Sequence, residues 1–311
     1  MILCLGGFAR VCSAELSGTL AVFHAGSLSV PFQKIGQTFM AKHPRVTVQL
    51  ESAGSRACAR KIVDLDRDCD VMASADYTVI DQLLIPAHAA WNIKFATNEM
   101  AIAYSETSRL ASRLQQGNWM DILMDKRVIF GRSDPNSDPC GYRAVMTMML
   151  AEAYYKKPGL AEALQKKDTR FIRPKETDLL GLLESHSIDY IFLYRSVIEQ
   201  HGLKCVLLPD AINLKQSAWA KAYGKAQVKI TGKTPGTFIV KQGGPMVYGL
   251  TIPKRSRNLE AALAFVQFIL EEDHGLAILK KMGQPSAVPS VSSTYDWIPE
   301  ALKPFALPSS E

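Results

Sequence analysis

Two short apolar runs in this chain end in the same way, and this repeat constrains the fold more than any other feature of the sequence. The run TLAVF at residues 19–23 leads into HAGSLSVPF, and RVTVQLES at residues 45–52 leads into AGSRACARKI. After the first Gly-Ser pair, Leu28, Phe32 and Ile35 recur at helical spacing. Each unit is therefore predicted to be a β-strand, a Gly-Ser turn and an α-helix.

Strands and helices continue to alternate along the rest of the chain. Further strand-like runs lie at residues 70–76, 91–96, 99–105, 127–133, 189–197 and 243–254, and a long helix is predicted from about Pro139 to Tyr155. This alternation indicates an α/β protein with largely parallel sheets. Ligands of such sheets bind beyond the carboxyl ends of the strands, and both Gly-Ser turns lie at such ends.

The order of the elements predicts two lobes. A chain of 311 residues is long enough for two compact domains. We expect residues 15–104 plus 249–311 to form lobe 1 and residues 105–248 to form lobe 2, so that the chain leaves the first lobe and later returns to it. Such a double crossing makes a hinge with a cleft between the lobes.

The first fourteen residues predict export. They are apolar and small and end in Cys-Ser-Ala, as at a signal-peptidase site, although the usual basic segment is missing. Either the true start lies upstream or the signal is weak. No later run approaches the roughly 18 apolar residues of a membrane span. The expected location is periplasmic or otherwise extracytoplasmic, with the protein soluble or peripherally membrane-associated.

The charge balance gives little support to a nucleic-acid partner. The net charge of +6 comes from 36 basic and 30 acidic residues, without a long Lys/Arg block. Beyond residue 14 the cysteines are Cys58, Cys69, Cys140 and Cys205. In an oxidising compartment Cys58 and Cys69 could close a short loop, and the alternative is buried free thiols. No C-x-x-C pair or histidine cluster indicates zinc.

The Gly-Ser turns offer hydrogen-bond donors to an anion. The first N–H groups of a helix have no intrahelical partner, and its N-terminus carries roughly half a positive charge. An oxyanion at Ser27 is therefore favoured, and Gly26 lets it approach the backbone closely. The alternative is that Ser27 merely caps its own helix.

Six stretches, in this order, resemble the tungstate/molybdate-binding proteins of ABC importers, in particular the archaeal-type WtpA group. They are FHAGSLSVPF, ESAGSRACARKI, DVMASADYTVID, SDPNSDPCGYR, DYIFLYRSV and GPMVYGLTIPK, and the resemblance runs from about Gly18 to Gly283. It implies a type II periplasmic-binding-protein fold, with two α/β lobes joined by a two-stranded hinge and the ligand in the cleft. It also implies a monomer that needs no cofactor and delivers tungstate or molybdate to an ABC permease and ATPase complex.

The resemblance also implies the ligand-binding residues. Ser27 and Ser55 resemble the first-lobe serines that donate to the oxyanion, and Tyr194 resembles the second-lobe tyrosine whose hydroxyl completes the shell. Such neutral donors suit a dianion that stays unprotonated near neutral pH. A pocket built only of donors would disfavour phosphate, whose protons require an acceptor.

Asp138 allows two interpretations. It precedes Pro139 as an N-cap with proline at the first helical position. In the resembling family, however, the aspartate of this DPCGYR motif can bind the tungsten or molybdenum centre directly. That family usually has a glutamate immediately before the tyrosine, where this chain has Leu193. We therefore expect oxyanion binding with altered metal coordination, five-coordinate or tetrahedral.

Two other functions compete with this one. The protein could be a receptor for another tetrahedral oxyanion such as sulfate, or a secreted Ser-dependent hydrolase with His24 as its base. A G-x-S-x-G elbow and an acid partner for the histidine are both missing, which disfavours the hydrolase and indicates a protein without enzymatic activity. Arg56 and Arg143 lie near the proposed pocket, and solvated or supporting roles are expected for both.

Overall fold

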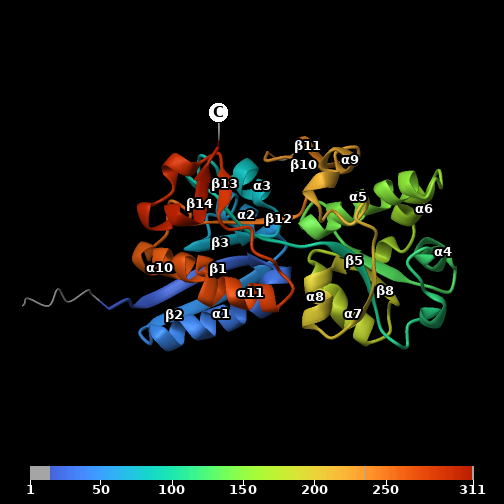
Figure 1. Ribbon diagram of the computed structural model, residues 1–311, viewed down its shortest axis with the longest axis horizontal. Coiled ribbons are helices and arrows are strands. Elements are labelled where there is room, and N and C mark those ends of the chain that lie inside the picture. The colour runs from blue at the N-terminus through green and yellow to red at the C-terminus, as the bar shows by residue number, and fades with distance from the viewer. Residues whose placement is uncertain (1–14, 235, 310–311) are drawn as a thin grey trace, which may run out of the picture.

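The computed structural model describes residues 15–234 and 236–309, which form two α/β lobes placed side by side (Figure 1). The segment predicted to be a signal, residues 1–14, lies outside the described residues. Within the described ranges, none of the helices combines the length and the apolar character that crossing a membrane requires. The two-lobed α/β fold predicted from the sequence is confirmed.

The first lobe is built on a five-stranded sheet with the strand order β2-β1-β3-β12-β4. Its strands are β1 (Gly18–Ala25), β2 (Val46–Ala53), β3 (Val71–Ser74), β4 (Ile93–Thr97) and β12 (Val247–Thr251). β1 runs parallel to β2 and β3, whereas β12 is antiparallel to β3 and β4. The sheet is therefore parallel except for the strand that returns from the second lobe.

The side chains of each strand point alternately to the two faces of this sheet. Both faces are apolar, and helices cover both. The helices are α1 (Ser29–Lys42), α2 (Ser55–Val63), α3 (Tyr77–Val79), α10 (Leu259–Leu270) and α11 (Ala277–Lys281). Val22 of β1 lies in the apolar cluster that contains residues of α1 and α10, while Phe23 lies in a second cluster with residues of α2. The ring of Phe39 in α1 packs edge-on against Phe265 of α10, at 5.0 Å between centroids.

The second lobe repeats this plan, with the strand order β7-β6-β8-β5-β9. Its strands are β5 (Met100–Tyr104), β6 (Phe130–Ser133), β7 (Ile172–Arg173), β8 (Tyr190–Tyr194) and β9 (Lys204–Leu207). Its helices are α4 (Trp119–Met124), α5 (Pro139–Tyr154), α6 (Leu160–Lys166), α7 (Leu180–Glu184), α8 (Arg195–Gln200) and α9 (Ala220–Tyr223). β6 is parallel to β7 and β8, whereas β5 is antiparallel to β8 and β9.

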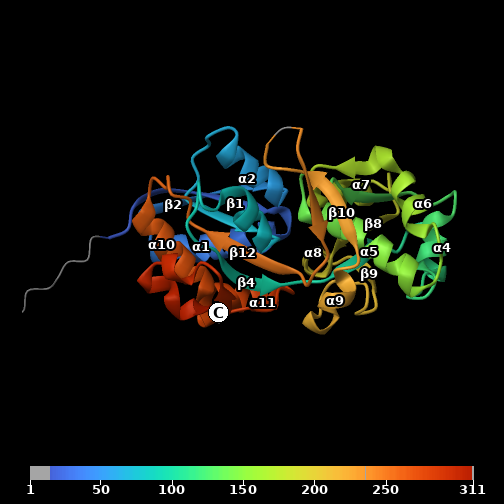
Figure 2. The ribbon, with the colours of Figure 1, turned by 90° about the horizontal axis from the view of Figure 1, so that it is seen from above.

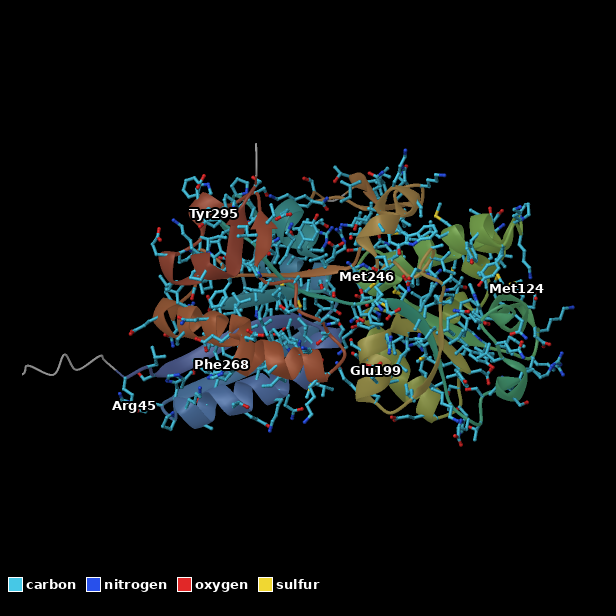
Figure 3. The ribbon with its side chains drawn as sticks, in the orientation of Figure 1. Arg45, Met124, Glu199, Met246, Phe268 and Tyr295 are labelled. Atoms are coloured by element: carbon cyan, nitrogen blue, oxygen red, sulfur yellow. The ribbon has the colours of Figure 1, made fainter. Side chains whose placement is uncertain are left out.

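The chain crosses between the lobes twice. The outgoing crossing runs from β4 to β5 through Asn98 and Glu99, and the returning one reaches β12 through residues 243–246, where Figure 3 shows Met246 at the junction. The sequence pattern predicts residues 100–104 in lobe 1 and a return to that lobe at residue 249, whereas β5 pairs with the second sheet and β12 begins at Val247. β4 and β5 both read as apolar strands and are separated by two residues, so their pattern does not reveal the sheet to which each belongs.

A hairpin that the sequence analysis did not predict lies beside the crossing. β10 (Gln227–Thr231) and β11 (Phe238–Gln242) pair antiparallel as a separate two-stranded sheet between the lobes (Figure 2). The four cysteines in the described residues are free thiols, and the predicted alternative of buried free thiols fits Cys58, Cys69 and Cys140, whereas Cys205 is partly exposed. Cys58 and Cys69 are both buried, and burial raises the pKa of the Cys58 thiol to about 12.

Candidate functional site

The first Gly-Ser turn is buried at the carboxyl end of β1. A 3₁₀ turn, Gly26–Leu28, joins β1 to α1, and Ser27 is 1% exposed. The Ser27 Oγ atom accepts a hydrogen bond from the hydroxyl of Tyr248 in β12, at 2.9 Å. No side chain caps the turn or α1 in the described structure, so Ser27 does not cap its own helix.

The second Gly-Ser turn repeats this arrangement at the carboxyl end of β2. Ser55 is the first residue of α2 and is fully buried. Its Oγ atom accepts a hydrogen bond from the backbone N–H of Ala75, which follows β3, at 2.9 Å. Three neighbouring parallel strands of the first sheet thus end in one place, as expected for a ligand site of an α/β sheet.

Asp138 is held at the start of α5 in the second lobe. Its Oδ1 atom accepts from the backbone N–H of Cys140 at 3.1 Å, so the predicted N-cap is present, and Pro139 occupies the first turn. Its Oδ2 atom accepts from the backbone N–H of Glu176 at 3.0 Å. The carboxyl group is 1% exposed, and burial raises its pKa above the usual value for aspartate.

Tyr194 ends β8, and its hydroxyl is bound by a buried arginine. Arg143 donates through Nη1 to the Tyr194 hydroxyl at 2.9 Å and to the first-lobe carbonyl of Ala75 at 2.8 Å. Burial raises the pKa of Tyr194 well above its usual value, so the phenol keeps its proton. Of the solvated and supporting roles expected for Arg143, the solvated one is wrong, because the guanidinium is buried, and its contacts with Tyr194 and Ala75 agree with the supporting one.

A second carboxylate, which the sequence pattern does not reveal, faces the first Gly-Ser turn. Glu176 begins a 3₁₀ turn, Glu176–Leu179, in the second lobe and is 1% exposed. Neither of its carboxylate oxygens has a hydrogen-bond partner among the described residues. Burial, and then the nearby charge of Asp138, raise the pKa of Glu176 well above its usual value.

Contacts between the lobes bring the predicted residues together. A Cβ atom added to Gly26 would lie 2.7 Å from each carboxylate oxygen of Glu176, so a side chain at this position would displace that carboxyl group. A Cβ atom added to Gly54 would lie 3.0 Å from Cβ of Asp138, and the N–H of Ala57 donates to the carbonyl of Ser137 at 3.2 Å. The two Gly-Ser turns therefore face the two carboxylates across the gap between the lobes.

This geometry corrects the expectation of a pocket built only of donors. Ser27, Ser55 and Tyr194 supply hydroxyl groups, whereas Asp138 and Glu176 supply carboxylate oxygens. Within the described residues, no group of three or more His, Cys, Asp or Glu side chains could hold a metal ion. The site can thus offer an anion both hydrogen-bond donors and two additional oxygen ligands.

His24 does not form a nucleophile–base pair with Ser27. Its Nδ1 atom is bonded to the carbonyl of Ala25 at 2.8 Å, and its ring packs on Phe32 at 5.5 Å between centroids. Burial lowers the pKa of His24 to about 4, so the ring is neutral near pH 7. This environment is that of a packed core histidine.

A second group of charged contacts joins the lobes beside the site. Asp76, at the end of β3, accepts from the Tyr142 hydroxyl at 2.5 Å and from Lys241 Nζ of β11 at 2.8 Å. Its Oδ2 atom also lies 3.8 Å from Arg143 Nη2. Burial alone would raise the pKa of Asp76, but the charges of Lys241 and Arg143 outweigh it and hold the pKa below the usual range.

The unpredicted hairpin is tied to the first lobe as well. Arg56 of α2 is buried and donates through Nε to the carbonyl of Asn136 at 3.0 Å and through Nη2 to that of Thr231 in β10. Arg60 donates to the carbonyl of Gly232 at 2.7 Å. The solvated role expected for Arg56 is therefore wrong, because its guanidinium binds backbone atoms of the second lobe.

Known proteins resemble this chain over almost its whole length. A family model described as bacterial extracellular solute-binding protein matches residues 20–284. The molybdate/tungstate-binding protein WtpA of Pyrococcus abyssi is 42% identical over 328 aligned positions, covering 96% of this chain and 93% of its own. A solute-binding protein of Petrotoga mobilis is 46% identical over 292 positions, with 94% and 91% covered. These relatives confirm the resemblance drawn from the six stretches.

Solved structures share the two-lobed fold at much lower identity. The periplasmic molybdate-binding protein of Azotobacter vinelandii matches with a TM-score of 0.61 and 17% identity, over 85% of this chain and 98% of its own. The sulfate-binding protein SubI of Mycobacterium tuberculosis matches with a TM-score of 0.60 and 12% identity, over 93% and 92%. At these identities the likeness concerns the fold alone.

Proposed function

Because this chain belongs to the family of bacterial extracellular solute-binding proteins, we propose that it captures molybdate or tungstate outside the cytoplasm and delivers the anion to an ABC permease with its ATPase. The relatives named for these two anions, at 41–42% identity, support this assignment. In this proposal Ser27, Ser55 and Tyr194 donate hydrogen bonds to the anion, and Gly26 lets it approach.

We propose that the two buried carboxyl groups, Asp138 and Glu176, determine which anion the protein selects. A carboxylate facing a tetrahedral dianion costs free energy, because two like charges repel strongly away from water. Molybdenum and tungsten can bind further oxygen atoms, whereas the centres of sulfate and phosphate do not. We propose that Asp138 and Glu176 bind the metal of the anion directly as carboxylates, with the proton that the raised pKa retains on Glu176 released to solvent, so that repulsion is replaced by coordination.

We propose Glu176 as the second carboxylate, because Leu193 occupies the position where the family usually has glutamate. In this proposal the second carboxylate comes not from β8 but from a turn that begins 17 residues before Leu193. Its two unpartnered oxygens face Gly26, at the N-terminal turn that we propose for the anion. Six oxygen ligands, four from the anion and two from the protein, are therefore the coordination that this proposal requires.

The proposal also accounts for the closed arrangement of the lobes. The first lobe supplies Ser27 and Ser55, and the second supplies Asp138, Glu176 and Tyr194. An anion that contacts both sets binds the closed form better than the open one, and this difference in affinity drives closure. The lobes need perform no chemistry on the anion.

Calorimetric titration with molybdate, tungstate, sulfate and phosphate tests the function. We expect tight binding of the first two anions and no saturable binding of the others. X-ray absorption of the tungstate complex should show six oxygen neighbours, and Glu176→Gln should reduce that number. Binding of sulfate in preference to molybdate would contradict the proposal, as would turnover of ester substrates without a rise of the melting temperature in tungstate.

A further inference from the structure

A serine hydroxyl at an anion site can face its ligand in two ways. It carries one proton, so it can donate to the ligand or turn that proton elsewhere and present a lone pair instead. The oxygens of molybdate and tungstate only accept hydrogen bonds. A site for such anions therefore gains affinity when another group already donates a hydrogen bond to each hydroxyl oxygen, because the hydroxyl proton is then left for the anion.

Two of the three hydroxyls have a donor that cannot change its direction. Ser55 Oγ accepts from the backbone N–H of Ala75, and the Tyr194 hydroxyl accepts from the guanidinium of Arg143. A backbone amide nitrogen and a guanidinium donate and never accept. The protons of Ser55 and Tyr194 are therefore available to a ligand.

Ser27 depends instead on a relay of two side chains that begins at the hinge. Asn98 lies in the outgoing crossing, and its Oδ1 atom accepts from the backbone N–H groups of Glu99 at 2.9 Å and Ser196 at 3.4 Å. These two contacts fix the orientation of the amide. Its Nδ2 atom therefore points to the Ser196 hydroxyl at 2.7 Å and to the Tyr248 hydroxyl at 2.9 Å.

The direction of the hydrogen bond from Asn98 to Tyr248 determines the direction of the one between Tyr248 and Ser27. Since Nδ2 of Asn98 can only donate, the Tyr248 hydroxyl is its acceptor and must use its own proton elsewhere. The described acceptor is Ser27 Oγ, at 2.9 Å, and Tyr248 is fully buried, which leaves it no contact with bulk water. Ser27 thus receives a hydrogen bond from Tyr248 and keeps its own proton free.

We propose that Asn98 and Tyr248 are positioning residues that hold the Ser27 hydroxyl as a donor toward the bound oxyanion. The proposal rests on the proposed function, because it assigns an anion to Ser27. It deepens that function by placing part of the anion selectivity in two residues that need not touch the ligand, Asn98 in the outgoing crossing and Tyr248 in β12.

A double-mutant cycle on the full chain tests the relay, with molybdate affinity as the readout. Tyr248→Phe should weaken molybdate binding by roughly tenfold, the effect of one lost buried hydrogen bond. In a Ser27→Ala background the same change should weaken binding by less than about twofold, since the relay acts only through Ser27. A purely structural role of Tyr248 would instead give equal losses in both backgrounds.

Two further variants complete the test. Tyr190→Phe removes a buried tyrosine hydroxyl that donates to the Arg109 carbonyl at 2.6 Å in the second lobe, and it should leave affinity unchanged. Asn98→Asp replaces the donor with an acceptor and reverses the relay, so it should weaken binding at least as much as Tyr248→Phe.

Equal losses in the two backgrounds, or unchanged affinity in Asn98→Asp, would overturn the relay while leaving the proposed function intact. Failure of the unmodified protein to bind either anion would overturn the proposed function, and the relay with it.

Discussion

Replacing Asp76 by asparagine should weaken anion binding without touching any residue proposed to contact the anion. The change keeps the shape of the side chain and the carbonyl-type oxygen that accepts from the N–H of Thr78 at the start of α3. It removes the negative charge that faces Lys241 and Arg143 across the gap between the lobes. The perturbation therefore acts on the contact between the lobes.

The structure gives the size of the effect. The side chains of Asp76 and Lys241 are 6% and 9% exposed, and their charged atoms lie 2.8 Å apart. Removing one partner of a buried pair costs about 3–5 kcal/mol, because the other charge stays buried without compensation. Opening the lobes returns Lys241 to water, so the cost falls on the closed form. At about 1.4 kcal/mol for each factor of ten, molybdate affinity should fall at least about a hundredfold.

Calorimetry of the two proteins with molybdate measures this loss, and small-angle scattering of the ligand-free proteins measures the closure. Asp189→Asn is the matched control, because Asp189 is buried to the same degree and pairs with Arg109 at 3.0 Å inside the second lobe. It should lower the melting temperature and leave the affinity unchanged. Equal affinities of Asp76→Asn and the unmodified protein would refute the reasoning, as would an equal loss in the control.

The pKa of Asp76 adds a pH dependence with a defined sign. Because the folded-state pKa lies below the ordinary value of about 3.9, the ion pair stabilises the closed form at every pH above that value. The stabilisation is lost only as the pH falls through the lowered pKa. Asp76 should therefore contribute no change in molybdate affinity between pH 7 and about pH 5. The difference in affinity between the unmodified protein and Asp76→Asn should be the same at both values.

Three further changes follow from the site. Ser27→Ala should weaken molybdate binding by about 1–3 kcal/mol, because a buried anion oxygen loses its donor, and calorimetry would show unchanged affinity if Ser27 has no such role. Glu176→Gln should weaken molybdate binding at least about tenfold, whereas Glu199→Gln, on a half-exposed side chain paired with Arg195, should not. The pKa of His24 is lowered to about 4 in the folded protein, so between pH 6.5 and 4 the unfolded chain binds a proton at this residue that the folded protein does not. Acid should therefore remove about 3 kcal/mol of the free energy of unfolding across that range, and denaturant unfolding of His24→Gln should show a smaller loss.

The local architecture could be predicted from sequence because its determinants are local. Gly26 and Ser27 follow an apolar strand and precede a helical repeat, and Asp138 precedes Pro139, so both junctions are visible in a few residues. The lobe to which β5 belongs could not be predicted in this way. Its partners β8 and β9 lie about 90 to 100 residues later, and pairing over such a separation leaves no mark on the strand itself.

Glu176 could not be predicted as a site residue either, for the same reason. It stands in the stretch RPKETDLL, which has no clear period, and three ordinary charged residues surround it there. Its importance arises from burial against Gly26, a residue of the other lobe that is 150 positions away. Leu193 next to Tyr194 led to the expectation of altered coordination, whereas the second carboxylate that we propose lies on a different turn. An acidic residue in a short segment between β7 and α7, close to the carboxyl end of a parallel strand, was the available signal.

The path of the chain through its two sheets also sets an order of events during synthesis. Every strand of the second sheet lies within residues 100–207, whereas β12, which separates β3 from β4, lies at residues 247–251. Domains fold as units while the polypeptide emerges from the ribosome. β4 therefore lacks its partner strand β12 until about 150 further residues have been translated. The first lobe, whose synthesis begins first, completes its sheet last.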